Sequence, residues 1–453
     1  MDLRRTAAVV AALAAIAGTA APAPGAPLRV DGQRLVDERG GTVLLRGTAL
    51  IEKHGDGLPD VGAEDWRQMR ELGFNTIRLG TAWEFVEPRP GEYDEAYLDA
   101  LAALAREAMA EGFWVVVDMH QDVWGRPLGN GAAAWTVAPA CAALEAVDLA
   151  QLTGAWALNY LSPWSLCQFT SFWADRGLQE RFARAWAEIA RRLAGAPRLA
   201  GYDLMNEPFQ GAFPPVVFEY GVLWPFYDRV AAAIRSVDPD AVVFEEPANY
   251  KNVHLPTAPP PGARAGAVYA PHVYGLWDWS DAFSRRDELI ALNMAWSGLE
   301  ATLARVPLWY GEFGMRRSAP DAERSLTQIY DIADRQLAGT AYWEWSRGEY
   351  GPLRPDGSLD PRRALTLSRP YPARTGGALR SFSFDAADGV FSMRWRQVAG
   401  AGASEVVLPA RRYGGGFTVD AGPGVGWTWD GARGVLVVEA EPGERRLTVR
   451  AAG

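Results

Sequence analysis

The sequence predicts an α/β protein, a closed (β/α)₈ TIM barrel followed by a small C-terminal antiparallel β-sandwich. The barrel is predicted by two observations: eight short apolar runs alternate with helical stretches, and the runs are almost continuously apolar, as strands covered on both faces are. The sandwich is predicted by a third, because after Arg369 the pattern changes to period-2 segments between Gly and Pro turns. An open doubly wound sheet is the alternative to the barrel. It would require a Gly-rich phosphate turn after an early strand, and the sequence has none.

The order of the apolar runs gives the order of the expected strands. They are Val43–Ala49, Asn75–Gly80, Phe113–His120, Gly201–Glu207, Ala241–Glu246, Ala267–His272, Pro307–Glu312 and Gly339–Trp345. Amphipathic stretches between them predict helices, including Asp94–Glu111, Gln179–Ala194, Phe226–Val237 and Ala322–Leu337. The sandwich strands are expected at Ser381–Asp385, Val390–Arg396, Glu405–Pro409, Gly416–Asp420, Val435–Ala440 and Arg445–Val449. We therefore expect a leader at 1–26, a barrel at 27–369 and a C-terminal domain at 370–453.

Composition limits the class of protein. With 453 residues, 49% hydrophobic and 22% charged, the chain is too apolar to be disordered as a whole. A net charge of -10 argues against nucleic acid as a partner. Of the 45 cationic residues only Lys53 and Lys251 are lysines. Four His and two Cys are too few for a zinc-finger or iron–sulfur framework.

The N-terminal residues are typical of a secretory signal. Arg4 and Arg5 precede an apolar run at 7–17 and small residues up to 26, and the run is too short to cross a bilayer. We therefore expect a secreted, extracellular protein without a stable membrane anchor. An oxidising compartment favours a disulfide between Cys141 and Cys167, with two free thiols as the alternative.

Two glutamates stand out because each ends an apolar run. Glu207 ends the fourth and Glu312 the seventh. The carboxyl ends of barrel strands meet at one mouth, so the two carboxylates would face each other there. This is the requirement for glycoside hydrolysis, in which one carboxyl group protonates the leaving oxygen and the other attacks the sugar or activates water. Two structural carboxylates paired with Arg are the alternative.

The motifs around these glutamates resemble glycoside hydrolase family 5, a retaining family with a (β/α)₈ barrel. Asn206-Glu207-Pro208 follows the fourth strand and Gly311-Glu312-Phe313-Gly314 the seventh. The stretch Asp118-Met-His-Gln-Asp122, with Lys53 and a C-terminal sandwich, is similar to the endoglycoceramidase branch, whose members release the whole glycan from glycosphingolipids.

The resemblance implies roles at matching positions. Glu207 is expected to be the general acid/base and Glu312 the nucleophile. Arg78 would keep Glu312 ionised, and His272 would orient the acid/base. Trp345 is the expected stacking platform, with Trp343, at the same parity, left open. The expected substrate-binding residues are Lys53, His120, Asp122, Asn206, Tyr274 and Trp345.

Two uncharged stretches bear on the substrate. Residues 149–174 and 208–218 follow the third and fourth strands and are rich in aromatic and aliphatic side chains. They would form a groove for ceramide or, alternatively, pack on the barrel rim. We therefore predict a monomeric endoglycoceramidase-like hydrolase that acts on glycosphingolipids in micelles or membrane surfaces, with no cofactor and no metal. The alternatives are a family 5 endo-β-glucanase or other β-glucosidase acting on soluble glycans, and a non-catalytic glycan-binding protein.

Overall fold

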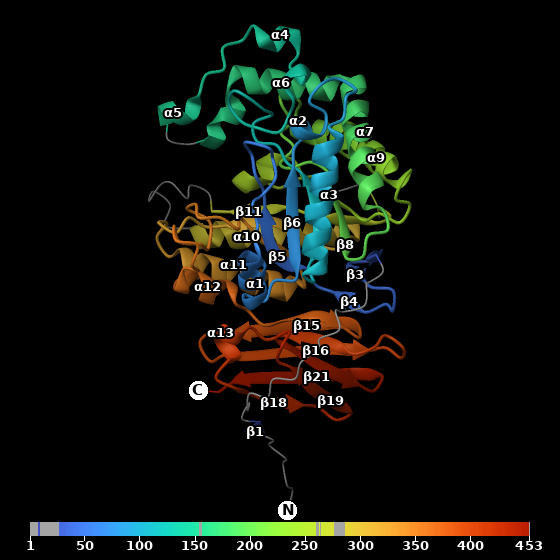
Figure 1. Cartoon of the computed structure of the whole chain (residues 1–453), viewed down its shortest axis with the longest axis vertical. Coiled ribbons are helices and arrows are strands. Elements are labelled where there is room, and N and C mark those ends of the chain that lie inside the picture. The colour runs from blue at the N-terminus through green and yellow to red at the C-terminus, as the bar shows by residue number, and fades with distance from the viewer. Residues whose placement is uncertain are drawn as a thin grey trace, which may run out of the picture.

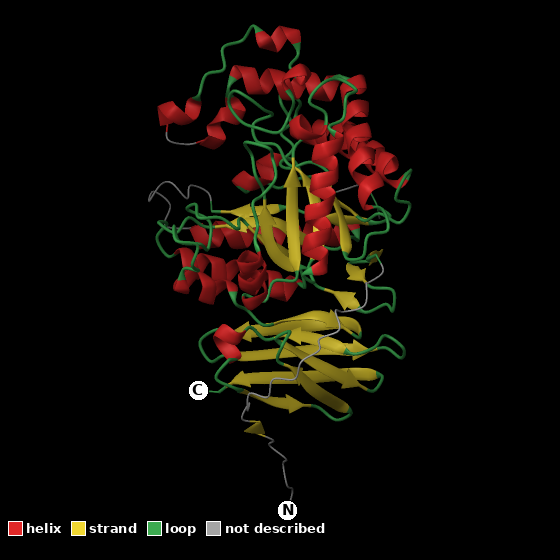
Figure 2. Cartoon of the chain, viewed as in Figure 1, coloured by secondary structure: helices red, strands yellow, loops and turns green. Residues whose placement is uncertain are grey.

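The structure is a computed structural model that describes residues 8–9, 27–153, 156–259, 262, 264–275 and 286–452. Apart from β1 (Ala8–Val9), the predicted leader lies outside the described residues. Two layers of architecture are visible in Figures 1 and 2: strands surrounded by helices, and below them antiparallel sheets that contain most of the C-terminal residues.

Parallel strands form a closed ring, which confirms the predicted barrel. The order is β10-β9-β8-β7-β6-β5-β13-β12-β11. Of the two end strands, β10 lies within the predicted sixth strand, whereas β11 begins at its last residue, His272, and continues to Tyr274. A parallel bridge between Tyr269 and Leu308 closes the ring. The strands are β5 (Arg46–Leu50), β6 (Thr76–Thr81), β7 (Trp114–Met119), β8 (Leu199–Asp203), β9 (Val243–Glu245), β10 (Ala267–Tyr269), β11 (His272–Tyr274), β12 (Trp309–Gly314) and β13 (Gly339–Tyr342).

Helices cover the outside of the barrel. In α3 (Glu95–Ala110), Asp94 accepts the N–H of Tyr97 at 2.9 Å and so caps the first turn, while Leu98 and Leu101 are buried against the strands. The other predicted helices are found as α7 (Arg176–Leu193), α9 (Trp224–Arg235) and α11 (Ala322–Gln336). The remaining helices and turns are α1 (Ala63–Glu71), α2 (Trp83–Val86), η1 (Ala134–Thr136), α4 (Pro139–Ala142), α5 (Leu149–Thr153), η2 (Trp156–Leu161), α6 (Pro163–Ala174), α8 (Pro215–Phe218), η3 (Glu219–Leu223), η4 (Asn249–Val253), α10 (Arg286–Ala304), α12 (Pro361–Leu367) and α13 (Ala410–Tyr413).

The C-terminal sandwich consists of a five-stranded and a seven-stranded antiparallel sheet. Phe382, Phe391 and Trp395 are buried in its core. The seven-stranded sheet also contains β2 (Arg29–Asp31), β3 (Arg34–Val36) and β4 (Thr42–Val43), because β4 pairs with β14. The C-terminal strands are β14 (Tyr371–Thr375), β15 (Gly377–Asp385), β16 (Val390–Gln397), β17 (Ser404–Val407), β18 (Phe417–Ala421), β19 (Val425–Asp430), β20 (Val435–Ala440) and β21 (Gly443–Ala451).

The sandwich lies below the amino ends of the barrel strands, whereas α4, α5 and α6 rise above their carboxyl ends (Figure 1). The two ends of the barrel therefore have different surroundings, and the predicted site residues lie at the end away from the sandwich. Within the described ranges, no helix combines the length and apolar character needed to cross a membrane.

Candidate active site

The carboxyl ends of the barrel strands bring the predicted site residues together, with the exception of Trp345. Glu207 and Glu312 are both buried, and one oxygen of each lies within 4.8 Å of one oxygen of the other. Burial raises the pKa of Glu207, a hydrogen bond from His272 opposes this rise, and the charge of Glu312 adds to it. The direction of this shift favours the protonated form of Glu207, which is the form that a general acid needs.

Glu312 is held by two donors. Arg78 Nη1 lies 2.6 Å from Oε1, and the hydroxyl of Tyr274 donates to Oε2 at 2.7 Å. Both hydrogen bonds fix the orientation of the Glu312 carboxyl group. The same phenol has a raised pKa because it is buried beside Glu312, so it remains a donor.

Arg78 is the cation at the centre of a buried acidic group. Besides Glu312 it contacts Asp118, Asp203 and Glu246 at 3.0, 2.8 and 2.9 Å. Oxygens of these last three carboxylates lie close enough together to ligate one metal ion. The guanidinium already supplies the positive charge among them, and the group as arranged is an arginine-centred network.

Glu246 also shapes the backbone that carries Glu207. Glu207 has a φ of 45°, a left-handed backbone conformation that residues other than Gly and Asn rarely adopt. Its N–H donates to Glu246 Oε2 at 2.7 Å. His272 lies between the two glutamates, with Nδ1 3.0 Å from Glu207 Oε1 and Nε2 3.0 Å from Glu246 Oε1. Burial lowers the pKa of His272, but Glu246 and Glu312 outweigh it, and the net pKa lies well above the ordinary value.

The third strand and the loop after β5 supply a second polar group. Lys53 Nζ lies 2.6 Å from Asp122 Oδ2, and His120 Nδ1 lies 2.8 Å from Asp118. Although burial and Lys53 lower the pKa of His120, Asp122 and Asp118 raise it to about 9. His120 also stacks on Trp343 with ring centres 5.4 Å apart, and Lys53 Nζ lies 4.6 Å from the Trp343 ring centre.

Trp345 lies apart from this group. It is 9% exposed, belongs to the barrel core, and its indole N–H donates to Asp65 on α1 at 2.9 Å. Trp343, in contrast, is half-buried and lies next to His120 and Lys53. Both tryptophans lie beyond Tyr342, where β13 ends, so strand parity does not decide which of them lies beside the site.

Glu246, Asp203 and Asn249 belong to this group of residues but were not predicted from the sequence. Asn249 Nδ2 lies 3.5 Å from Glu207 Oε2. Glu246 ends the fifth apolar run just as Glu207 and Glu312 end theirs, so the same rule could have identified it. Asp203 lies inside the predicted run Gly201–Glu207, so the rule about strand ends did not select it. Its ion pair with Arg78 is a contact between distant residues that the local sequence does not indicate.

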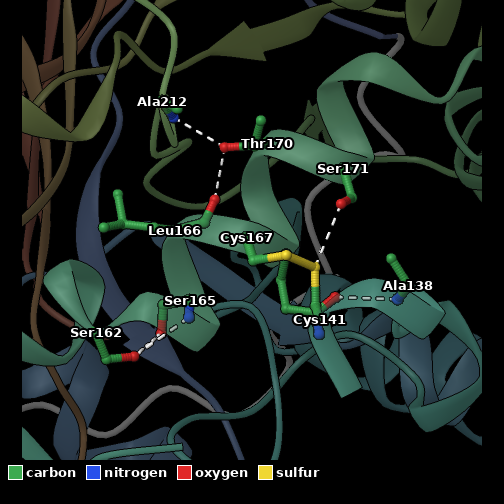
Figure 3. Close-up of a disulfide and its surroundings, with 10 residues drawn as sticks. Ala138, Cys141, Ser162, Ser165, Leu166, Cys167, Thr170, Ser171 and Ala212 are labelled. Carbon is green, nitrogen blue, oxygen red and sulfur yellow. Dashed lines mark hydrogen bonds between the residues drawn. A yellow bond between two sulfur atoms is a disulfide. The ribbon is translucent and has the colours of Figure 1, made fainter. Parts of the chain in front are cut away.

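The loops after β7 and β8 lie side by side above this site. The predicted disulfide is present between Cys141 on α4 and Cys167 on α6, with Cα atoms 5.6 Å apart. Thr170, one turn further along α6, accepts the N–H of Ala212 in the loop after β8 (Figure 3). Most aromatic rings of these loops are buried, but several aliphatic and aromatic side chains are exposed. These are Leu152, Trp156, Leu161, Val216, Val217 and Tyr220.

Comparisons with known proteins agree with this geometry. Residues 36–349 match the family described as "Cellulase (glycosyl hydrolase family 5)", and residues 369–450 match "Glycoside hydrolase family 5 C-terminal domain". The chain is 28% identical over 445 residues to "Endoglycoceramidase I" of Rhodococcus hoagii (strain 103S), covering 91% of this chain and 85% of that protein.

Solved structures of endo-glycoceramidase II from Rhodococcus sp. are similar throughout. Its "Ganglioside GM3 Complex" has 30% identity and a TM-score of 0.84, covering 93% of this chain and 100% of that chain. Its "Lactosyl-Enzyme Intermediate" has 29% identity and a TM-score of 0.82, with the same coverage. With a matching barrel, a matching C-terminal domain and paired glutamates at strand ends four and seven, the chain belongs to glycoside hydrolase family 5, in its endoglycoceramidase branch.

Proposed function

We propose that this glycoside hydrolase cleaves the bond between the glycan and the ceramide of glycosphingolipids, by a retaining double displacement. The observation that carries the proposal is the carboxylate pair, because oxygens of Glu207 and Glu312 lie within 4.8 Å of one another. Retaining enzymes hold their carboxyl groups about 5–5.5 Å apart, whereas inverting enzymes leave room for a water molecule. The similarity to relatives named endoglycoceramidase supports the substrate class.

In the proposed first step, Glu312 attacks the anomeric carbon of the glucose attached to ceramide. Arg78 and Tyr274 orient its carboxylate for this attack. Glu207 transfers its proton to the departing ceramide oxygen, so the glycosidic bond breaks without releasing an alkoxide. The products are ceramide and a glycosyl ester on Glu312.

In the second step, Glu207, now ionised, removes a proton from water, and the oxygen of that water attacks the anomeric carbon. Two inversions give net retention. Asn206 is expected to bind the sugar 2-hydroxyl. One of its N–H groups donates to the Gln121 carbonyl and its oxygen accepts from Arg78, which leaves a second N–H for the sugar.

The experiment that tests this function is product analysis on a panel of defined glycolipids. Glucosyl-, lactosyl- and sialyllactosyl-ceramide are incubated with the enzyme, and products are identified by mass spectrometry. Ceramide is expected from all three, together with glucose from glucosylceramide and the intact oligosaccharide from the other two. Release of single sugars from the non-reducing end, or activity confined to soluble β-glucans, would contradict the proposal.

We also propose export from the cell. The leader-like residues 1–26 and the Cys141–Cys167 disulfide, which forms in oxidising compartments, support it.

Lys53 is expected to bind a hydroxyl group of the glucose at the cleavage point. Its raised pKa, which results from Asp122 outweighing burial, keeps it charged as a donor. Lys53→Ala should lose about 1.5–3 kcal/mol of transition-state binding, about 10- to 150-fold in kcat/KM on lactosylceramide. Wild-type kcat/KM in this variant would exclude the role.

Trp343 and Trp345 should respond differently to substitution. Trp343→Ala removes the proposed sugar platform, so kcat/KM should fall by about tenfold or more with a small change in Tm. Trp345→Ala removes a buried side chain and should destabilise the fold by about 3–5 kcal/mol. Steady-state kinetics and thermal melting of both variants measure this contrast, and the reverse pattern would restore Trp345 as the platform.

The exposed valines of α8 should matter only for lipid substrates. Val216 and Val217 are 63% and 57% exposed on α8, in the segment that follows Glu207, and we propose that they contact ceramide. Replacing both with Ser should cost on the order of 2 kcal/mol, roughly thirtyfold, on lactosylceramide and almost nothing on an aryl lactoside. Val398→Ser, at a 47% exposed position in the C-terminal sandwich, is the matched control and should change neither activity. Equal losses on both substrates would assign the valines a structural role.

A further inference from the structure

Lys251 is one of only two lysines in the chain, and it is completely buried. It lies in η4, which follows β9 at the catalytic end of the barrel. Its Nζ lies 2.5 Å from Glu300 Oε2 on α10. Burying two charges costs about as much as their attraction returns, so such a pair is a poor source of net stability. Its position next to the active site suggests a different purpose.

Glu300 holds the segment 249–257 at two points, Lys251 and Thr257. Its Oε2 contacts Lys251 and accepts the Tyr269 hydroxyl at 2.8 Å. Its Oε1 accepts both the N–H and the hydroxyl of Thr257, at 2.9 and 3.0 Å. A second residue of α10, Asn293, donates to the Lys251 carbonyl at 3.3 Å. The turn between 249 and 257 is thus fixed to one rigid helix.

This clamped turn reaches the surroundings of both catalytic glutamates. At its start, Asn249 Nδ2 lies 3.5 Å from Glu207 Oε2. Further along, His254 Nε2 donates to the Tyr274 carbonyl at 2.8 Å, and the Tyr274 hydroxyl donates to Glu312. A shift of the turn would therefore move partners of both carboxyl groups.

Asn249 contacts Oε2 of Glu207, which is the oxygen that must transfer the proton. Glu207 Oε1 lies 3.0 Å from His272 Nδ1, and a protonated His272 donates to it. The proton of the Glu207 carboxyl group therefore belongs on Oε2, and Asn249 touches that oxygen. An N–H donated to Oε2 limits its rotation toward and away from the leaving oxygen.

We propose that Lys251 and Glu300 are positioning residues for the reaction: they hold the turn so that Asn249 fixes Glu207 Oε2 in line with the leaving group. The inference rests on the proposed acid role of Glu207 and is independent of the lipid substrate. It predicts a defect in proton transfer, which a general loss of packing would not produce selectively.

The test compares two aryl lactosides that differ in their need for an acid. A phenyl leaving group needs protonation, whereas a dinitrophenyl leaving group departs without it. The ratio of the two kcat/KM values, phenyl over dinitrophenyl, thus measures acid assistance. We expect Asn249→Ala, Lys251→Met and the double variant Lys251→Met/Glu300→Gln each to lower this ratio about tenfold. The double variant leaves no unpaired buried charge and decides the matter if Lys251→Met does not fold.

Two further variants serve as controls. Glu207→Ala gives the value of the ratio when no acid is present. Arg374→Met breaks an ion pair with Asp37, between the N-terminal hairpin and β14, and should leave the ratio unchanged. A wild-type ratio in Asn249→Ala or in a folded Lys251 variant would overturn the positioning role and leave the acid role of Glu207 intact. An unchanged ratio in Glu207→Ala would instead remove the acid assignment on which it rests. If neither Lys251 variant folds, the pair serves the fold, and the proposal is also overturned.

Discussion

Glu312→Ala is expected to lower turnover of lipid and aryl substrates alike by at least about 10⁴-fold, because it removes the carboxylate proposed to form the glycosyl ester. The fold should survive, since Arg78 keeps its contacts with Asp118, Asp203 and Glu246. Circular dichroism and thermal melting check this point.

Covalent labelling tests the same assignment through a product that accumulates, rather than through a loss of activity. A 2-deoxy-2-fluoro aryl glycoside slows the second step and should accumulate an ester on Glu312 of the wild-type enzyme. Peptide mass spectrometry locates the label. A label on any other residue, or substantial turnover by a folded Glu312→Ala variant, would refute the nucleophile assignment.

Glu207→Ala is expected to show the second largest effect and a distinctive rescue. Without an acid/base, hydrolysis of an activated aryl glycoside should stop at the glycosyl ester, because water needs a base to attack. Azide is already anionic and needs none, so added azide should restore turnover and give a β-glycosyl azide.

The rescue also discriminates between mechanisms. An α-azide would indicate an inverting displacement. No azide product at all from a folded variant would mean that Glu207 is not the residue that activates water. Asn206→Ala is a suitable neighbour control, because it should weaken sugar binding without creating a response to azide.

The sequence predicted most of the catalytic end of the barrel because one rule applies there. Polar residues that end apolar strands, such as Glu207, Glu312 and His272, face the mouth wherever the strand pattern is clear. The rule stops where the strand stops, because Trp343 and Trp345 both lie beyond Tyr342, the last residue of β13. The family resemblance implied Trp345 as the platform and left Trp343 open at the same parity, whereas the structure brings Trp343 to His120.

Contacts between distant segments could not be read from local patterns. The hairpin of β2 and β3, with β4, was assigned to the barrel region by its position in the chain, yet β4 pairs with β14 more than 300 residues later. Likewise, the clamp of Lys251 by Glu300 joins a loop to a helix 49 residues away, and neither residue lies in a motif that marks the contact. Pairing partners of this kind are selected by packing in three dimensions.

The anomeric form of the first-released sugar is the most direct test of the proposed reaction. Wild-type enzyme is mixed with lactosylceramide in detergent micelles, and the lactose signals are followed by proton NMR before mutarotation. Glu207 and Glu312, with oxygens within 4.8 Å of one another, predict that β-lactose and ceramide appear first and that the α-anomer grows in later. Initial α-lactose, or free galactose in place of intact lactose, would contradict the account.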